Sequence, residues 1–99
     1  MASGRADIPV PPEEAFELVK RNVSALRWTL VHEDIKTGVV RARTPATLRS
    51  WGEEVRFAIT GKTEGSTVYV ESNPAAQVFD WGKSGENVNT VIRKLLESG

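Results

Sequence analysis

Apolar residues recur at three- and four-residue steps near both ends of the chain, and at two-residue steps between them. The first helical pattern follows Pro11-Pro12-Glu13-Glu14, whose prolines and acidic side chains suit the first turn of a helix. It predicts a helix over roughly 12–25. The second pattern predicts a helix that starts between Trp81 and Gly85 and ends near Glu97.

The two-residue pattern predicts β-strands. A short strand at 5–10 precedes the first helix, and Pro9 places it at a sheet edge. Four antiparallel strands then follow in sequence, each with one apolar face. Residues 34–38 form the first turn between them and 61–66 form a hairpin loop, while Gly52 lies in a bend.

These faces predict one fold. Two helices with one apolar stripe each must cover the apolar face of one sheet. We therefore expect a single domain over 1–99, an α+β two-layer sandwich. Its antiparallel sheet has four to five strands with two helices on one face, in the order β-α-β-β-β-β-α. The expected core is Phe16, Val19, Val23, Trp28, Leu30, Val40, Ala42, Val55, Phe57, Ile59, Val68, Val70, Val88, Val91, Ile92 and Leu95.

His32 is the single histidine, so any Ser-His-Asp catalytic set would need it. Its strand parity, shared with Trp28 and Leu30, predicts a packed residue at or near the edge of the core. No serine lies in a nucleophile-elbow sequence. Nucleophilic catalysis is therefore disfavoured.

The amino-acid composition argues against several further classes of function. Thirteen Lys and Arg balance thirteen Asp and Glu, which argues against a nucleic-acid binder. The absence of cysteine excludes disulfides and thiol chemistry and fits a reducing cytoplasm, and one histidine excludes multi-histidine metal sites. With no secretory leader and no long apolar run, we expect a cytoplasmic chain with no membrane association, metal or cofactor.

The outward face of the sheet is charged. Functionally it could dock an anionic ligand or a partner, and a face-to-face dimer is an intermediate possibility. The interleaved glutamates favour a solvated surface with weak ion pairs instead. The residues expected there are Arg41, Arg43, Glu54, Arg56, Tyr69 and Glu71.

The segment at 80–87 precedes a helix, whose free N–H groups attract anions. It resembles the end of a phosphate-binding loop, but Gln77 replaces the required first glycine, so nucleotide hydrolysis is rejected. Asp80 or Ser84 as N-cap is the simpler interpretation. The speculative anion site comprises Asp80, Gly82, Lys83, Ser84 and Asn87.

Aromatic residues give a second candidate site. They could line a shallow groove between helix and sheet, or plug the open ends of the sandwich, which we favour. The residues are Trp28, Trp51, Phe79 and Trp81.

Two short motifs carry a resemblance. Ser50-Trp51-Gly52-Glu53-Glu54-Val55 and the 80–88 segment resemble the signatures of a group of short prokaryotic domains, and more widely the domain-of-unknown-function family numbered fourteen ninety-nine. The resemblance implies the same element order and no activity. The opening Ile8-Pro9-Val10-Pro11-Pro12 is similar, at the fold level, to the start of START or Bet v 1-type helix-grip domains.

We therefore expect a small non-enzymatic domain that binds a protein partner or self-associates. The alternative is a module that binds a lipid-like or aromatic small molecule, which would need a pocket of several hundred Å³. An enzyme is the third reading.

Overall fold

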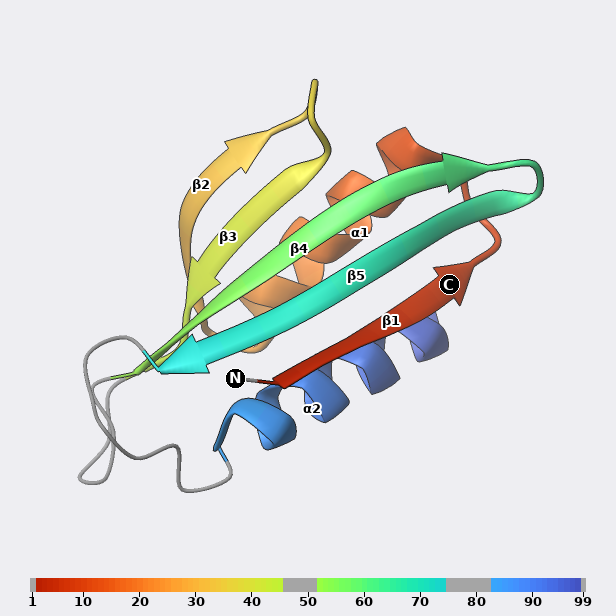
Figure 1. Ribbon diagram of the computed structural model, residues 1–99. Helices are drawn as coiled ribbons and strands as arrows, with labels where there is room; N and C mark the ends of the chain where they lie inside the picture. The colour runs from red at the N-terminus through yellow and green to blue at the C-terminus, as the bar shows by residue number, and fades with distance from the viewer. Residues whose placement is uncertain (1, 46–51, 75–82, 99) are drawn as a thin grey trace.

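A computed structural model describes residues 2–45, 52–74 and 83–98 of the chain (Figure 1). Its elements follow the predicted β-α-β-β-β-β-α order. They are β1 (Ala2–Ile8), α1 (Pro12–Ala25), β2 (Thr29–Asp34), β3 (Val39–Arg43), β4 (Glu53–Lys62), β5 (Gly65–Pro74) and α2 (Lys83–Ser98).

The strands form one antiparallel sheet in the order β1-β5-β4-β3-β2. β2 to β5 form a meander, and β1 returns to pair with β5, so β1 and β2 are the two edges. The predicted α+β fold with an antiparallel sheet is confirmed.

Both helices cover the same face of this sheet. α2 packs on β1 and β5, α1 packs across β2 to β5, and the helices contact each other (Figure 1). Gly4 lets α2 approach β1, since a Cβ there would lie 2.6 Å from Cδ1 of Ile92. The buried apolar residues form one cluster: Ala6, Ile8, Ala15, Phe16, Leu18, Val19, Val23, Val40, Ala42, Val55, Phe57, Ile59, Val68, Val70, Val88, Val91 and Leu95.

The end of α1 fixes where β2 begins. Trp28 donates its backbone N–H to the Val23 carbonyl and Arg27 donates to Ser24, both at 3.0 Å. This is a Schellman motif, in which the residue after the C-cap adopts the left-handed conformation. Arg27 takes that position, with φ of 61°, and Trp28 is left partly buried against the core.

β2 departs from the predicted alternation. Leu30 pairs with Ala42, but His32 pairs with Arg41, so the register shifts between them and Val31 is the extra residue of a β-bulge. Directly paired residues share a face of the sheet. Hence Leu30 lies on the helix side while His32 is exposed on the outer side. The prediction that His32 packs at the core edge is wrong, because the bulge reverses the parity after Leu30.

Leu30 was also expected in the core and is 39% exposed. β2 is the outermost strand, and α1 meets it through polar groups: Lys20 lies 3.1 Å from the Glu33 carboxylate. Trp28 and Ile92 are partly buried rather than fully so. Ala6 and Ile8 belong to the core although the expected core omitted them.

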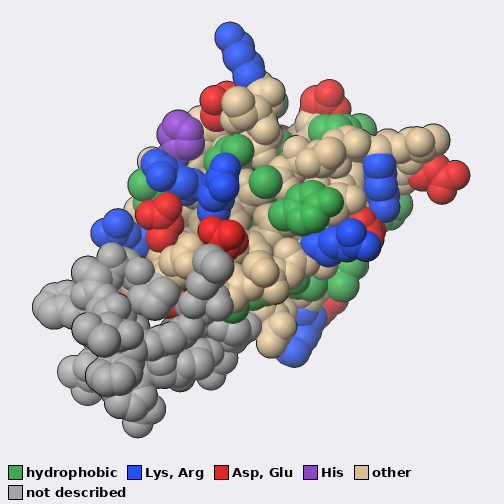
Figure 2. Space-filling model, in the orientation of Figure 1, with side chains coloured by type: hydrophobic (Ala, Val, Ile, Leu, Met, Phe, Trp, Pro, Cys, Tyr) green, Lys and Arg blue, Asp and Glu red, His purple; other side chains and the backbone are tan. Residues whose placement is uncertain are grey.

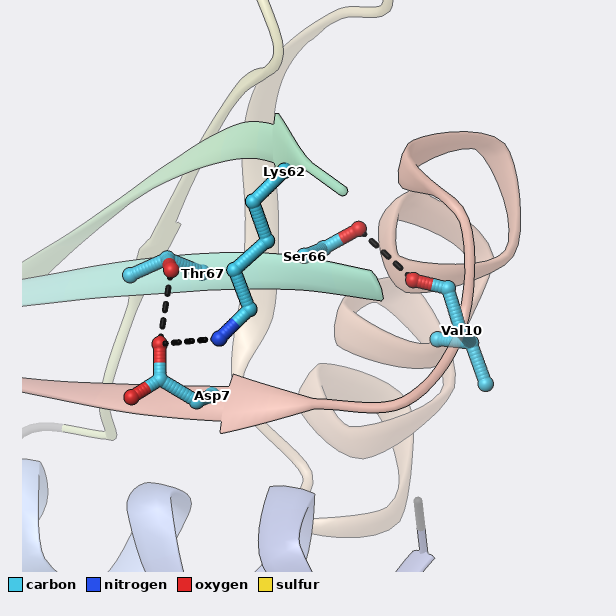
Figure 3. A network of polar contacts seen from close by, with 5 residues as sticks. All are labelled: Asp7, Val10, Lys62, Ser66 and Thr67. Atoms are coloured by element: carbon cyan, nitrogen blue, oxygen red, sulfur yellow. Dashed lines mark hydrogen bonds and ion pairs between the residues drawn. The ribbon is translucent and has the colours of Figure 1, made fainter. Parts of the chain in front are cut away.

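The opposite edge is held by a polar network near the β4–β5 turn (Figure 3). The Thr67 hydroxyl donates to Oδ1 of Asp7 at 2.7 Å, and the Lys62 ammonium lies 3.1 Å from the same oxygen. The Thr67 hydrogen bond first, and Lys62 next, hold the pKa of Asp7 below its ordinary value of 3.8. Ser66 donates to the Val10 carbonyl at 2.7 Å, which ties the segment after β1 to β5.

Strand limits differ slightly from expectation. β1 lies at Ala2–Ile8 rather than 5–10, and Lys62 pairs with Gly65, so the β4–β5 turn is shorter than the expected loop at 61–66. Within the described ranges, no helix has the length and apolar character needed to cross a membrane.

Candidate functional site

A groove opens between the start of α1 and the sheet. Its volume is about 180 Å³. Phe16 of α1 and Ile59 of β4 are both buried and line it, and Ile35 in the β2–β3 turn is its most exposed apolar residue, at 61%. The full lining is Pro12, Glu13, Phe16, Ile35, Lys36, Thr37, Gly38 and Ile59.

Two glycines shape this groove. Gly38 has φ of 72°, and a Cβ there would lie 2.6 Å from the Ile59 carbonyl oxygen. The Ile59 N–H donates to the Gly38 carbonyl at 2.8 Å, so the turn is fastened to β4. A Cβ on Gly61 would lie 2.8 Å from Pro12, which shows how closely the start of α1 approaches the end of β4. One wall is therefore fastened by a backbone hydrogen bond, and the other by the close approach of the Pro12 ring to Gly61.

The turn itself is also ordered by local hydrogen bonds. The backbone N–H of Lys36 donates to Oδ1 of Asp34 at 3.0 Å, and the Gly38 N–H donates to the Asp34 carbonyl at 2.9 Å. This Asx-type arrangement leaves the Ile35 side chain projecting outward. An apolar side chain at the rim, above an apolar floor, suits a small aromatic or aliphatic group.

A cationic group lies further along α1. Lys20 is 3.1 Å from Glu33 and 3.5 Å from Glu17, and its ammonium lies 5.7 Å from the centre of the Phe16 ring. The Glu33 interaction, followed by that of Glu17, raises the pKa of Lys20 above its ordinary value of 10.5. Lys20 is thus engaged in holding α1 to β2.

The predicted aromatic groove is described only at one residue. Trp28 packs against the core after the end of α1, whereas the groove lies at the start of that helix. Trp51, Phe79 and Trp81 lie outside the described residues. The set therefore stays a prediction. Sequence reasoning placed Ile35 and Gly38 in a turn but missed the groove, although a large apolar residue in a turn that ends in glycine was its signal.

The speculative anion site is likewise described only in part. Asp80 and Gly82 lie outside the described residues, and the backbone of Lys83 and Ser84 begins α2, within the range expected for its start. Asn87 is described, and it is buried.

Asn87 belongs to a set of buried polar groups on the inner side of the sandwich. Nδ2 of Asn22, Oγ of Ser72 and Nδ2 of Asn87 are inaccessible and have no hydrogen-bond partner in the part of the chain that the structure describes. Ser72 pairs with Ala2 at the start of β1, so its hydroxyl lies at the opposite end of the sheet from the groove. Unpartnered buried polar groups cost about 1–3 kcal/mol each, so a hydrogen-bonding group placed beside any one of them would be stabilised.

Metal binding finds no support among the described residues. No group of three or more histidine, aspartate or glutamate side chains in the ranges 2–45, 52–74 and 83–98 lies close enough to hold an ion.

Comparison with known proteins identifies the fold and no family. No protein-family model matches the chain, and no curated protein matches it. The solved structure of the di-domain ARO/CYC StfQ from the steffimycin biosynthetic pathway is similar, with a TM-score of 0.72 and 7% sequence identity. The similarity covers 99% of this chain and 44% of that one, so this chain spans less than half of its neighbour. At this identity the likeness shows the fold alone.

This result separates the two resemblances seen in the sequence. The fold-level likeness to START or Bet v 1-type helix-grip domains agrees with the structural neighbour. The likeness to the domain-of-unknown-function family numbered fourteen ninety-nine gains no support, since no family model matches.

Proposed function

We propose that this protein is a small-molecule-binding module whose ligand inserts an apolar or aromatic group between α1 and the sheet. The observation that carries the proposal is the groove floored by Phe16 and Ile59 beneath the β2–β3 turn. The partner-binding reading favoured by composition and pattern takes second place.

The size of the groove restricts the ligand. Drug-sized ligands occupy pockets of about 300–1,000 Å³. The groove offers about 180 Å³, which is less than the several hundred Å³ expected for a lipid-like ligand held whole. A single ring or a short aliphatic segment fits that space. The rest of a larger ligand would lie across Ile35 and Thr37 at the rim, where Glu13 and Lys36 offer one charge of each sign.

The fold supports the same proposal. The similar structure belongs to a di-domain ARO/CYC protein from the steffimycin biosynthetic pathway. A shared fold does not carry an activity. That the chain is not an enzyme, and that it is cytoplasmic, therefore stay predictions.

The proposal is tested by titrating the isotope-labelled protein with a panel of small aromatic and short-chain aliphatic compounds and following backbone amide shifts. A ligand of the proposed site shifts the amides of Phe16, Ile35 and Gly38. If every compound leaves these amides unchanged, or shifts only those near Asn22, Ser72 and Asn87, the groove is not the binding site.

A matched pair of variants then assigns the binding energy. Ile35→Ala removes the rim, and we expect it to weaken binding about three- to tenfold, in line with about 1 kcal/mol for a partly buried aliphatic group. Val31→Ala removes a similarly exposed aliphatic side chain from β2, outside the groove lining, and should leave binding unchanged. Equal losses in both variants would contradict the proposal.

Self-association through β2 is a second candidate. β2 is an edge strand, and Leu30 and Val31 are 39% and 48% exposed along it. An exposed apolar edge favours strand pairing with another chain. Sedimentation tests this directly: a concentration-dependent dimer that Leu30→Lys abolishes supports it, and a monomer at all concentrations removes it.

A further inference from the structure

We propose that the outer face of the sheet carries a second, separate binding site for a small aromatic anion, formed by His32, Arg41 and Arg56. His32, Arg41 and Arg56 lie on the outer face of the sheet, whereas Phe16 and Ile59 of the groove lie on the inner side, and only Thr37 of the β2–β3 turn lines both. The site does not depend on the function proposed above.

The three residues lie side by side on three neighbouring strands. His32 of β2 pairs directly with Arg41 of β3, and Arg41 pairs directly with Arg56 of β4. Directly paired side chains have Cβ atoms about 4.5–5.5 Å apart. Figure 2 shows the histidine beside a group of basic side chains on this face. All three line one hollow of about 460 Å³, together with Thr37, Val39 and Glu54.

The bulge at Val31 creates this arrangement. In an unbroken strand His32 would share the helix side with Leu30, and the row would contain only the two arginines. One extra residue turns the imidazole to the outer face. Bulges commonly re-aim a side chain next to functional sites, and here the re-aimed side chain adds a third nitrogen-bearing group to the row.

Acidic side chains on the same face neutralise the positive charge of this row only in part. Glu54 lies 3.6 Å from the guanidinium of Arg41. Glu71 is the cross-strand partner of Arg56, but its Oε1 accepts a hydrogen bond from Asn73 at 3.2 Å, and Arg56 makes no ion pair within the described residues. Like charges placed directly opposite one another destabilise a sheet. A bound anion would relieve the repulsion between Arg41 and Arg56.

An apolar strip adjoins the row. Val39 and Ala58 are paired with each other and lie two residues along their strands from Arg41 and Arg56. Ala58 is also paired with Tyr69, which lies two residues from Glu71 on β5. Arg56, Ala58 and Tyr69 also line a neighbouring hollow of about 260 Å³. Two residues along a strand span about 6.6 Å, so an anionic group at the arginines places an attached ring over Ala58 beside Tyr69. The arrangement therefore fits an aromatic sulfonate, carboxylate or phosphate.

Benzenesulfonate is the probe, with methanesulfonate as the anion lacking a ring. Both are titrated into the labelled protein and followed through the amides of Val39, Arg41 and Ala58. We expect saturable shifts at these amides with benzenesulfonate and at least fivefold weaker binding of methanesulfonate. Absence of saturable shifts would contradict the site. Equal affinity for the two probes would contradict the claim that an aromatic ring contributes to binding.

Charge variants locate the anion. Arg56→Gln should weaken benzenesulfonate binding about tenfold, as expected for loss of one charge-assisted hydrogen bond, and His32→Gln about threefold. Arg21→Gln makes the same charge change on an exposed residue of α1, in the other layer, and should have no effect. If Arg21→Gln weakens binding as much as Arg56→Gln, the attraction is unspecific and the proposal fails. Unchanged amide spectra of the free variants show that the fold is retained.

Discussion

The two edge strands of the sheet have similar sequence patterns and opposite environments. In β1 the inward residues Ala6 and Ile8 are each 2% exposed, whereas in β2 the inward Leu30 is 39% exposed. α2 lies along β1, with Gly4 allowing close approach, while α1 meets β2 through the Lys20–Glu33 ion pair. Burial of an edge strand is thus decided by the helix laid over it. The less buried edge is also the one whose bulge moves His32 to the outer face.

Truncating the inward residue of each edge should expose this difference most strongly. Ile8→Ala leaves a cavity in a close-packed region and should lower the free energy of unfolding by about 2–4 kcal/mol. Leu30→Ala removes an isomeric side chain of the same size that is 39% exposed, and it should cost less than about 1 kcal/mol. Urea denaturation measures both. Similar losses would show that β2 is as well covered as β1.

The contact between α2 and β1 can be broken from the strand side. Gly4→Val would place its Cβ 2.6 Å from Cδ1 of Ile92 and 3.0 Å from Cγ1 of Val88. We expect overpacking to cost about 1–3 kcal/mol, partly recovered in the double variant Gly4→Val with Ile92→Ala. A fully additive double variant would mean that Ile92 is not the obstacle.

The connection between α1 and β2 can be tested at Arg27, which adopts the left-handed conformation after α1. Glycine adopts this conformation without a Cβ penalty. Arg27→Gly should therefore raise the free energy of unfolding by about 0.5–1 kcal/mol, as measured by thermal or urea unfolding. The control variant Ser24→Gly, at an exposed position within α1, should lower the free energy of unfolding instead.

The smallest expected effect concerns Asp7, at the end of β1. The Thr67 hydroxyl and then Lys62 lower the pKa of Asp7 in the folded protein, so its contribution to stability is present above the ordinary pKa of 3.8 and is lost as pH falls through the lowered folded-state value. Asp7→Asn should lower Tm slightly at about pH 6, and the difference should shrink at about pH 2–3.

An Asp7→Asn difference that stays constant across this range would contradict the assignment to the ionised carboxylate.

Sequence periodicity was sufficient for most of the fold. It predicted α1 over 12–25, the element order and the outward position of Arg41, Arg56 and Tyr69, because amphipathic alternation determines which face each residue occupies. It failed after Leu30, because a one-residue bulge reverses the parity and leaves no mark in the hydrophobic pattern. It also failed at Leu30 itself, since alternation does not reveal whether a helix covers a strand.

The candidate site was less accessible to sequence reasoning. The groove depends on the Gly38 contact with Ile59 and on the approach of Pro12 to Gly61, residues distant in the chain. The pairing of β3 with β4 brings Gly38 to Ile59, and the packing of α1 on the sheet brings Pro12 to Gly61. The basic row on the outer face was visible as two arginines, but its third member depends on the bulge.

The reversed parity of β2 is tested most directly by nuclear Overhauser contacts of the His32 ring. With the bulge at Val31, the imidazole protons should show contacts to the Arg41 side chain and to Val39 on the outer face of β3. Contacts instead to Lys20 or Phe16 of α1 would place His32 on the helix side and contradict both the bulge and the anion site built on it.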